Sequence, residues 1–369
     1  MPSRNRLRRV LWGAVALIGL VLLVVAVLGG FTPAGRGVGG PCQATSGMRA
    51  LCAMNKPEDL LRLGDSEWVL AGNMGNDEWK QGGFYAIRTR DKAFHAITPD
   101  LSRPAAPPYR DCPGAPDRAS LSAHGIALRS GPDGAHALYV VNHGGRESIE
   151  VFDVRVSDRG PELSWSGCVV LPPEHAANSV ATLPDGGLVI TIPHHPSATS
   201  KGKVLRWAPG GEWAEVPGTR FSYDNGILVS PDGAWLYVAE YMGRRLHKVP
   251  LGGKEGDARS VELGFRPDNL RFAPDGAILA TGHPVSLPRL GLCFTLGCGI
   301  PTEVARVDAT TLQATTLYER ESDITFSAGT SAIVVDDELW IGSFQSRALL
   351  IVPFTALKAP VLPGAPSNR

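Results

Sequence analysis

Short apolar segments alternate with tight turns along most of the chain, and four of them share one design. Each has a few apolar residues, a turn on Pro-Asp-Gly, and a second segment rich in β-branched or aromatic residues. This pattern is typical of a β-hairpin. The four clear copies are HGIALRSGPDGAHALYVVNH (124–143), NSVATLPDGGLVITIPHH (178–195), FSYDNGILVSPDGAWLYVAE (221–240) and DNLRFAPDGAILATGHP (268–284). Two weaker copies flank them at residues 58–72 and 330–343, so the pattern predicts six units.

The spacing of the copies predicts how the units are arranged. The turn prolines of the four clear copies, Pro132, Pro184, Pro231 and Pro274, are 52, 47 and 43 residues apart. This spacing is close to the length of one propeller blade. We therefore expect an all-β fold, a six-bladed β-propeller. An all-β sandwich is the alternative, but it does not account for a repeat at blade length.

The first forty residues form a different kind of segment. Four arginines within residues 1–9 precede an uncharged apolar run, which at about 1.5 Å per residue can cross a hydrocarbon core of about 30 Å. Since arginines stay cytoplasmic, the rest of the chain is expected on the extracytoplasmic side, periplasmic or extracellular. The expected organisation is a basic cytoplasmic segment (1–9), a transmembrane signal anchor (10–31), a linker (32–54), the propeller (55–356) and a C-terminal tail (357–369). A cleaved signal peptide is the alternative, although its apolar region is usually only about 7 to 15 residues long.

Composition narrows the set of partners. Lys plus Arg equals Asp plus Glu, at 36 each, and no basic run follows residue 40, so a nucleic acid partner is not expected. The six cysteines lie in the exported part of the chain, where disulfides form. Their spacing does not select one of about 15 pairings, although Cys293 and Cys298 could close a short loop.

Polar residues share one position of the repeat. Six residues before the turn proline lie Ile126, Asn178, Asn225 and Asp268, and Asn269 follows Asp268. The same count from the turn at Gly64 leads to Glu58, with Asp59 next to it. Because equivalent positions of propeller blades face the same place, we expect these side chains to meet near the central channel.

Carboxylate and amide oxygens are the ligands that calcium prefers, six to eight of them at about 2.3–2.6 Å. The sequence therefore predicts a Ca²⁺ site formed by Glu58, Asn178, Asn225, Asp268 and Asn269. Any single Asn or Asp before a strand is more often an Asx turn or a cap. Because the polar residues of several blades share one repeat position, a metal site is favoured over separate Asx turns or caps.

The chain resembles the paraoxonases, which are calcium-dependent lactonases and arylesterases built on six-bladed propellers, and more loosely the wider SMP-30/gluconolactonase group. The matching segments run in family order from PEDL (57–60) through HGI (124–126), YVVNH (139–143), NSVA (178–181) and DNGILVSPDGAWLYVAE (224–240) to PDNLRF (267–272) and TGHP (281–284). Any one segment is common among propellers, whereas the combination is specific.

The resemblance implies roles for individual residues. It implies that the five residues named above hold the catalytic calcium, and that Asp59 and the backbone carbonyl of Ile126 contribute to a second, structural calcium. This second site lacks one ligand, because Ser179 stands where the family usually has an Asp. The resemblance also implies a histidine dyad at His124 and His143, and pocket histidines at His283 and His194, the latter preceded by Pro193 instead of the usual Asp.

These residues suit hydrolysis of a lactone or aryl ester. Calcium can polarise the carbonyl, while a neutral His124 takes the proton of the attacking water and His143 relays it. The chain has no GxSxG or HExxH motif, which removes the main support for a serine hydrolase or a zinc protease. The expected partners are a small lactone or ester substrate and, through the N-terminal helix, a membrane.

Two other functions are compatible with the same residues. A calcium-dependent phosphotriesterase could use the same site, with a carboxylate near the metal as nucleophile. A membrane-tethered propeller could also bind without catalysis, because a fold does not determine a function. The histidine pair favours catalysis, since a binding platform does not need a general base.

Overall fold

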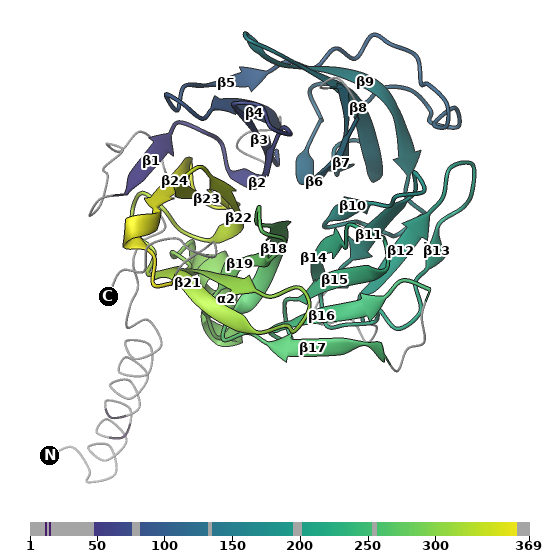
Figure 1. Cartoon of the computed structure of the whole chain (residues 1–369). Helices are drawn as coiled ribbons and strands as arrows, with labels where there is room; N and C mark the ends of the chain where they lie inside the picture. The colour runs from purple at the N-terminus through teal and green to yellow at the C-terminus, as the bar shows by residue number, and fades with distance from the viewer. Residues whose placement is uncertain are drawn as a thin grey trace, which may run out of the picture.

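The computed structural model describes residues 12, 15, 48–75, 82–131, 135–194, 201–252 and 257–359. Among them, strands form six four-stranded antiparallel sheets arranged as a ring (Figure 1). The predicted six-bladed β-propeller is therefore confirmed. The predicted anchor, residues 10–31, lies outside the described residues apart from Trp12 and Val15, which are helical. In the described part of the chain, no helix has the length and apolarity that a membrane crossing requires.

Each predicted hairpin supplies the two inner strands of one blade. The first three blades are β2 (Pro57–Arg62), β3 (Trp68–Asn73), β4 (Gly83–Arg88) and β5 (Phe94–Ile97); β6 (Ala123–Ser130), β7 (Ala135–Asn142), β8 (Ser148–Ser157) and β9 (Gly160–Val170); and β10 (Val180–Thr182), β11 (Leu188–Ile192), β12 (Lys203–Trp207) and β13 (Ala214–Glu215). We number the blades in this order. The first strand of each blade lies nearest the centre of the ring (Figure 1).

The other three blades repeat the arrangement. They are β14 (Asp224–Val229), β15 (Trp235–Glu240), β16 (Arg245–Pro250) and β17 (Arg259–Glu262); β18 (Arg266–Phe272), β19 (Ile278–His283), β20 (Thr302–Val307) and β21 (Ala314–Arg320); and β22 (Gly329–Val335), β23 (Glu338–Ser343) and β24 (Ala348–Pro353), completed by β1 (Arg49–Cys52). A short 3-10 helix, Phe354–Ala356, follows β24.

The N-terminal strand closes the ring. β1 pairs with β24, with Arg49 opposite Ile351 and Cys52 opposite Ala348. The sixth blade therefore combines strands from both ends of the described chain, which ties the first blade to the last. Residues 49–52 were expected in the linker, so the propeller begins earlier than the sequence predicted. The reason is that β1 is a short outer strand with no turn motif of its own.

The hydrophobic core lies between neighbouring blades. Between the first two blades, for example, Leu70 and Phe84 pack with Val140 and Phe152, all of them buried. Equivalent clusters lie between the other neighbouring blades. Burial of such side chains contributes about 1.5–3 kcal/mol each, so the ring is held together by blade-to-blade packing that leaves the polar inner edges free for other roles.

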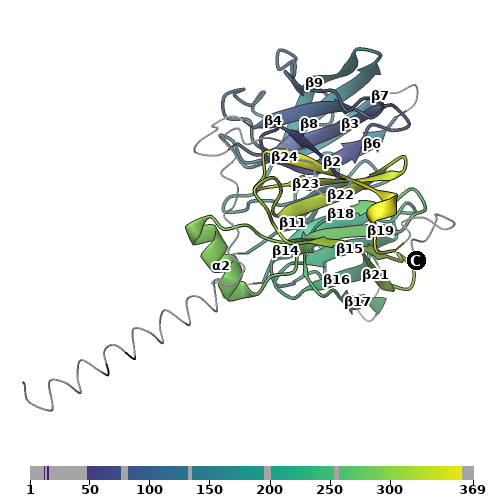
Figure 2. The ribbon, with the colours of Figure 1, turned by 90° about the vertical axis from the view of Figure 1, so that its left-hand side faces the viewer.

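Two insertions carry disulfides. Cys112 in the proline-rich segment before the second blade pairs with Cys168 in β9, and Cys293 pairs with Cys298, as the short loop suggested. Cys52 is disulfide-bonded as well. Such bonds agree with an oxidising compartment. The second pair closes the end of α2 (Leu287–Leu296), a helix capped by Ser286 and ended by Gly297 in the left-handed conformation, which projects from one face of the ring (Figure 2).

Candidate active site

A cavity of about 580 Å³ lies over the inner strands of the ring, and polar residues from five blades meet in it. These residues are Glu58, His124, Asn178, Asn225 and Asp268. The rest of the wall is mainly apolar and includes Met74, Met242, Leu287, Leu290, Phe294 and Phe344. The cavity thus combines a polar end with an apolar wall, part of which belongs to α2. This is the usual composition of a site for a small organic ligand.

The inner strands carry β-bulges at the positions of the polar residues. The register between the two inner strands shifts between Pro57 and Asp59, between Asp224 and Ile227, and between Pro267 and Leu270. The second and sixth blades have a shift at the same place. Successive residues of a regular strand point to opposite faces, whereas a bulge re-aims a side chain. The bulges therefore explain how Glu58, Asn225 and Asp268 turn toward the channel, whereas Asn178 lies just before β10 of the third blade, whose inner strands pair without a register shift.

Glycines allow neighbouring inner strands to approach closely beside these residues. A Cβ on Gly125 would lie 2.6 Å from the carbonyl oxygen of Asn178, and one on Gly226 would lie 2.5 Å from that of Asp268. Each distance is shorter than a van der Waals contact, so only glycine fits. The glycines in HGI and DNG thus set the distance between the residues that form the site.

Several buried oxygens of the cavity have no hydrogen-bond partner among the residues that the structure describes. They are Oε2 of Glu58, Oδ1 of Asn178 and Oδ1 of Asn225. The other carboxylate oxygen of Glu58 accepts a hydrogen bond from Nδ2 of Asn269 at 2.7 Å. Leaving a buried polar atom unpaired costs about 1–3 kcal/mol. Three such acceptors at one place therefore form a set that fits a bound cation.

Burial raises the pKa of both carboxyl groups at the site. The pKa of Glu58 lies well above its usual range because of burial and of its neighbours Asp59 and Asp268. Burial, with a smaller contribution from Asp59, likewise raises the pKa of Asp268, against a hydrogen bond from the Asn225 side chain. Crowded carboxylates of this kind ionise readily only beside a positive charge. The raised pKa values of Glu58 and Asp268 thus agree with a cation bound by the oxygens of the cavity.

The predicted histidines His124 and His143 are in hydrogen-bond contact, and a third residue, Glu147, contacts His143. His124 Nδ1 is 2.9 Å from His143 Nε2, and His143 Nδ1 is 2.8 Å from Oε2 of Glu147. An ionised carboxylate only accepts, so His143 Nδ1 donates to it and His143 Nε2 accepts from His124 Nδ1. Nε2 of His124, which lies 3.9 Å from Oε1 of Glu58, is then left with a free lone pair. Glu147 was missed in the sequence, although it stands four residues after His143.

The environment keeps His124 neutral. Burial, with a smaller electrostatic contribution from the neighbouring His143, lowers the pKa of His124 from 6.5 to about 3. A neutral imidazole with a free Nε2 is the form that accepts a proton. Because the residue also lines the cavity, it meets the geometric requirement for a general base.

The other predicted histidines do not line the cavity. His283 is fully buried, its Nδ1 is 2.9 Å from the Tyr241 hydroxyl, and it is Tyr241 that faces the cavity. His194 follows β11, and burial, with smaller electrostatic contributions from Lys203, His175 and Arg220, lowers its pKa. Tyr241 was not singled out in the sequence, since nothing in its local pattern distinguishes it from a strand residue.

The two predicted ligands of the second calcium also lie close together, but an arginine side chain lies between them. Asp59 and the carbonyl oxygen of Ile126 both contact the guanidinium of Arg271.

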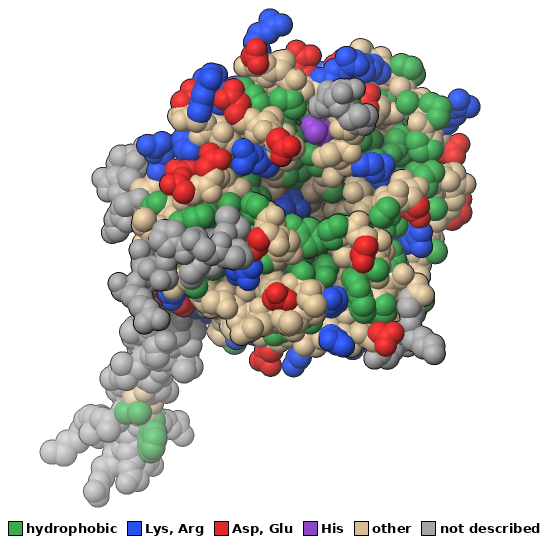
Figure 3. Space-filling view, viewed as in Figure 1, with side chains coloured by type: hydrophobic (Ala, Val, Ile, Leu, Met, Phe, Trp, Pro, Cys, Tyr) green, Lys and Arg blue, Asp and Glu red, His purple; other side chains and the backbone are tan. Residues whose placement is uncertain are grey.

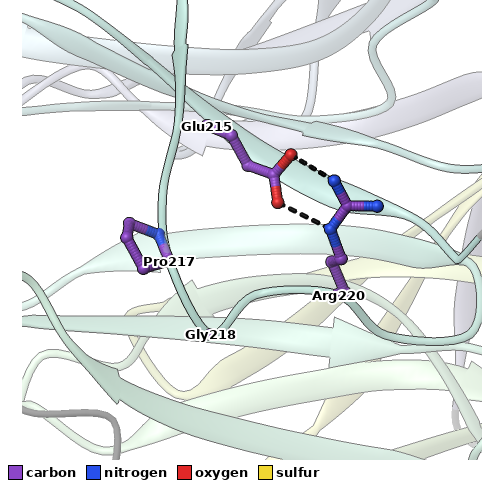
Figure 4. Close-up of a pocket in the computed structure, with 4 residues that line it drawn as sticks. All are labelled: Glu215, Pro217, Gly218 and Arg220. Carbon is purple, nitrogen blue, oxygen red and sulfur yellow. Dashed lines mark hydrogen bonds and ion pairs between the residues drawn. The ribbon is translucent and has the colours of Figure 1, made fainter.

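A second depression, of about 410 Å³, lies beside β13, the outermost strand of the third blade, and Figure 4 shows the residues that line it. Glu215 and Arg220 face each other there in a two-bonded ion pair, with Nε to Oε1 at 2.7 Å and Nη2 to Oε2 at 2.6 Å. Their charges compensate each other in an exposed setting, so we assign this depression no chemistry.

Comparison with known proteins agrees with this architecture. A family model described as "SMP-30/Gluconolactonase/LRE-like region" matches residues 130–285. Mouse serum paraoxonase/lactonase 3 is 29% identical over 259 residues, which cover 64% of this chain and 70% of the mouse protein. Human serum paraoxonase/arylesterase 2 is 24% identical over 296 residues, which cover 72% and 81%. These matches confirm the resemblance to the paraoxonases and to the wider SMP-30/gluconolactonase-like group.

A solved structure extends the comparison at the level of the fold. A protein of unknown function from Bacteroides thetaiotaomicron superposes with a TM-score of 0.51 at 10% identity, covering 83% of this chain and 76% of that one. At this identity the likeness concerns the fold alone.

Proposed function

We propose that this chain is a calcium-dependent hydrolase of lactones or aryl esters. The observation that carries the proposal is the juxtaposition, in one cavity, of unpaired buried oxygens on three blades with a neutral His124. The resemblance to the paraoxonases supports a lactone-hydrolysing activity for this site. In addition, the apolar part of the wall suits an uncharged organic substrate.

The residues that would hold the calcium are Glu58, Asn178, Asn225, Asp268 and Asn269. In the described part of the chain, no cluster of three or more His, Cys, Asp or Glu side chains is able to hold a metal. The amide oxygens of the asparagines must therefore supply the remaining ligands, a mixture that suits calcium. When bound, the ion would polarise the substrate carbonyl and stabilise negative charge on its oxygen.

The protein's own residues provide the proton transfer. His124 Nε2 takes the proton of a water molecule held in the cavity, as its lone pair is free. The positive charge that develops is shared with His143 through the 2.9 Å contact and is stabilised by Glu147. His124, still hydrogen-bonded to His143, then returns the proton to the leaving oxygen, which completes the hydrolysis. No covalent intermediate with the enzyme is needed.

The test is a substrate panel with the full-length protein. We expect hydrolysis of aliphatic lactones and of phenyl acetate, loss of activity after EDTA, and recovery with Ca²⁺ but not with Mg²⁺, which prefers a smaller octahedral site. Faster turnover of a dialkyl aryl phosphotriester than of any lactone would replace the proposal with a phosphotriesterase. No turnover of lactone, ester or phosphotriester with calcium bound would indicate a binding propeller.

Replacing Glu147 with Gln is expected to lower kcat for lactones about tenfold with little change in KM. A Gln amide can donate to His143 Nδ1, which permits the reversed hydrogen-bond direction and a protonated His124 Nε2. The measurement is kcat and KM as a function of pH, with Glu162→Gln, an exposed residue of the same blade, as control. A pH profile identical to that of the wild type would show that Glu147 does not orient the histidines.

A further inference from the structure

One arginine crosses the centre of the ring. Arg271 lies on β18, three residues after Asp268. Its Nε donates to the carbonyl oxygen of Leu60 on the first blade at 2.6 Å, and its Nη2 donates to the carbonyl oxygen of Ile126 on the second blade at 2.9 Å. The fifth blade is thereby bonded directly to the first two.

The same guanidinium forms an ion pair with Asp59. Nη2 of Arg271 donates to Oδ2 of the carboxylate, whose side chain is fully buried, while 11% of the arginine side chain is exposed. The Asp59 oxygens also accept backbone hydrogen bonds, Oδ1 from Leu60 at 3.0 Å and Oδ2 from Ile126 at 2.9 Å. In contrast to the oxygens of the cavity, both Asp59 oxygens are satisfied by the protein.

These contacts do not fit a second calcium. Asp59 and the Ile126 carbonyl, the two predicted ligands, are both engaged by Arg271, and Ser179 offers no carboxylate. A calcium ion needs six to eight oxygen ligands. It would also have to share Asp59 with a guanidinium that stays charged at any ordinary pH. Where the ring is hollowed at its centre, Figure 3 shows Lys or Arg side-chain atoms at the bottom of the hollow.

We infer that Arg271 takes the place of the second calcium, as a covalently attached cation that links the first, second and fifth blades. A guanidinium suits this role because its planar array of donors serves several acceptors at once. The chain then binds a single calcium ion, and the centre of the ring keeps its cation when calcium is chelated.

The experiment compares the full-length wild type with Arg271→Met and with Arg206→Met. The control removes an exposed arginine paired with Asp185 on the third blade. Calcium bound per chain is measured by titration calorimetry, and Tm is measured in EDTA and in calcium. We expect one calcium ion in the wild type and an additional, weaker one in Arg271→Met. In EDTA, the Tm of Arg271→Met should fall by about 10 °C and partly recover with calcium, because a buried carboxylate loses its partner. Arg206→Met should change little.

Two calcium ions in the wild type would overturn the inference, and so would an Arg271→Met protein that melts in EDTA like the control. Should Arg271→Met fail to fold, the wild-type stoichiometry decides, and Arg271→Lys, which keeps the charge, must show that same stoichiometry. A wild type that binds no calcium would contradict the proposed function and the single-ion stoichiometry that rests on it, whereas the comparison of Tm values in EDTA would still decide whether Arg271 is the cation that holds Asp59.

Discussion

Asn225→Ala is expected to abolish calcium binding and lactone hydrolysis together. Oδ1 of Asn225 is buried in the cavity and has no donor among the described residues, so a bound cation would offset the cost of burying it. Outer-shell changes around a metal already cost 10–100-fold in affinity. Loss of a direct ligand should therefore lower the affinity at least about a hundredfold. Calorimetric calcium titration and kcat/KM at saturating calcium are the measurements.

Asn225→Asp is the matched comparison, because it keeps an oxygen ligand and adds a charge. We expect it to retain calcium and a large part of the activity, but to lower Tm in EDTA, since it places a further carboxylate beside Asp268. If Asn225→Ala keeps both calcium and hydrolysis, the cavity oxygens are not the metal site. If it loses hydrolysis and keeps calcium, the ion lies elsewhere and Asn225 acts on the substrate.

The propeller architecture and the shared repeat position of the polar residues could be predicted because both depend on residues that are close together in the sequence. Pro-Asp-Gly turns repeat at blade length, and the six inner hairpins lie where the pattern placed them. Counting from the turns then aligned Asn178, Asn225 and Asp268 in one register. Side chains at equivalent positions of a closed ring must meet, and these three line one cavity.

What the pattern did not predict depends on contacts between distant segments. The bulges that turn Glu58 and Asp268 inward are defects of strand pairing with no turn residue to mark them. β1 closes the ring as a four-residue strand inside an expected linker. Arg271 reads as an ordinary charged strand residue, yet its partners are Asp59 and Ile126, 212 and 145 residues away in the chain.

His124→Gln is expected to lower kcat for lactones about 10²–10⁴-fold while calcium affinity stays near the wild-type value. Glutamine has a similar size and can still donate to His143 Nε2, but it cannot take a proton. His124 is not among the oxygen donors, so the metal site should survive. The control is His95→Gln, an exposed residue on the outer strand β5 of the first blade. Loss of calcium affinity in His124→Gln would instead assign the histidine to holding the metal site together.

The same substitution should change how stability depends on pH. Since burial lowers the pKa of His124 to about 3, the unfolded chain, with a histidine pKa near 6.5, binds a proton that the folded chain does not between these values. The stability of the wild type therefore falls as pH decreases from about 6.5 toward 3, and His124→Gln removes this contribution. Tm measured in EDTA between pH 7 and pH 4 should decrease less in His124→Gln than in the wild type. Parallel curves would mean that His124 has the same pKa in the folded as in the unfolded chain, so that burial does not keep it neutral.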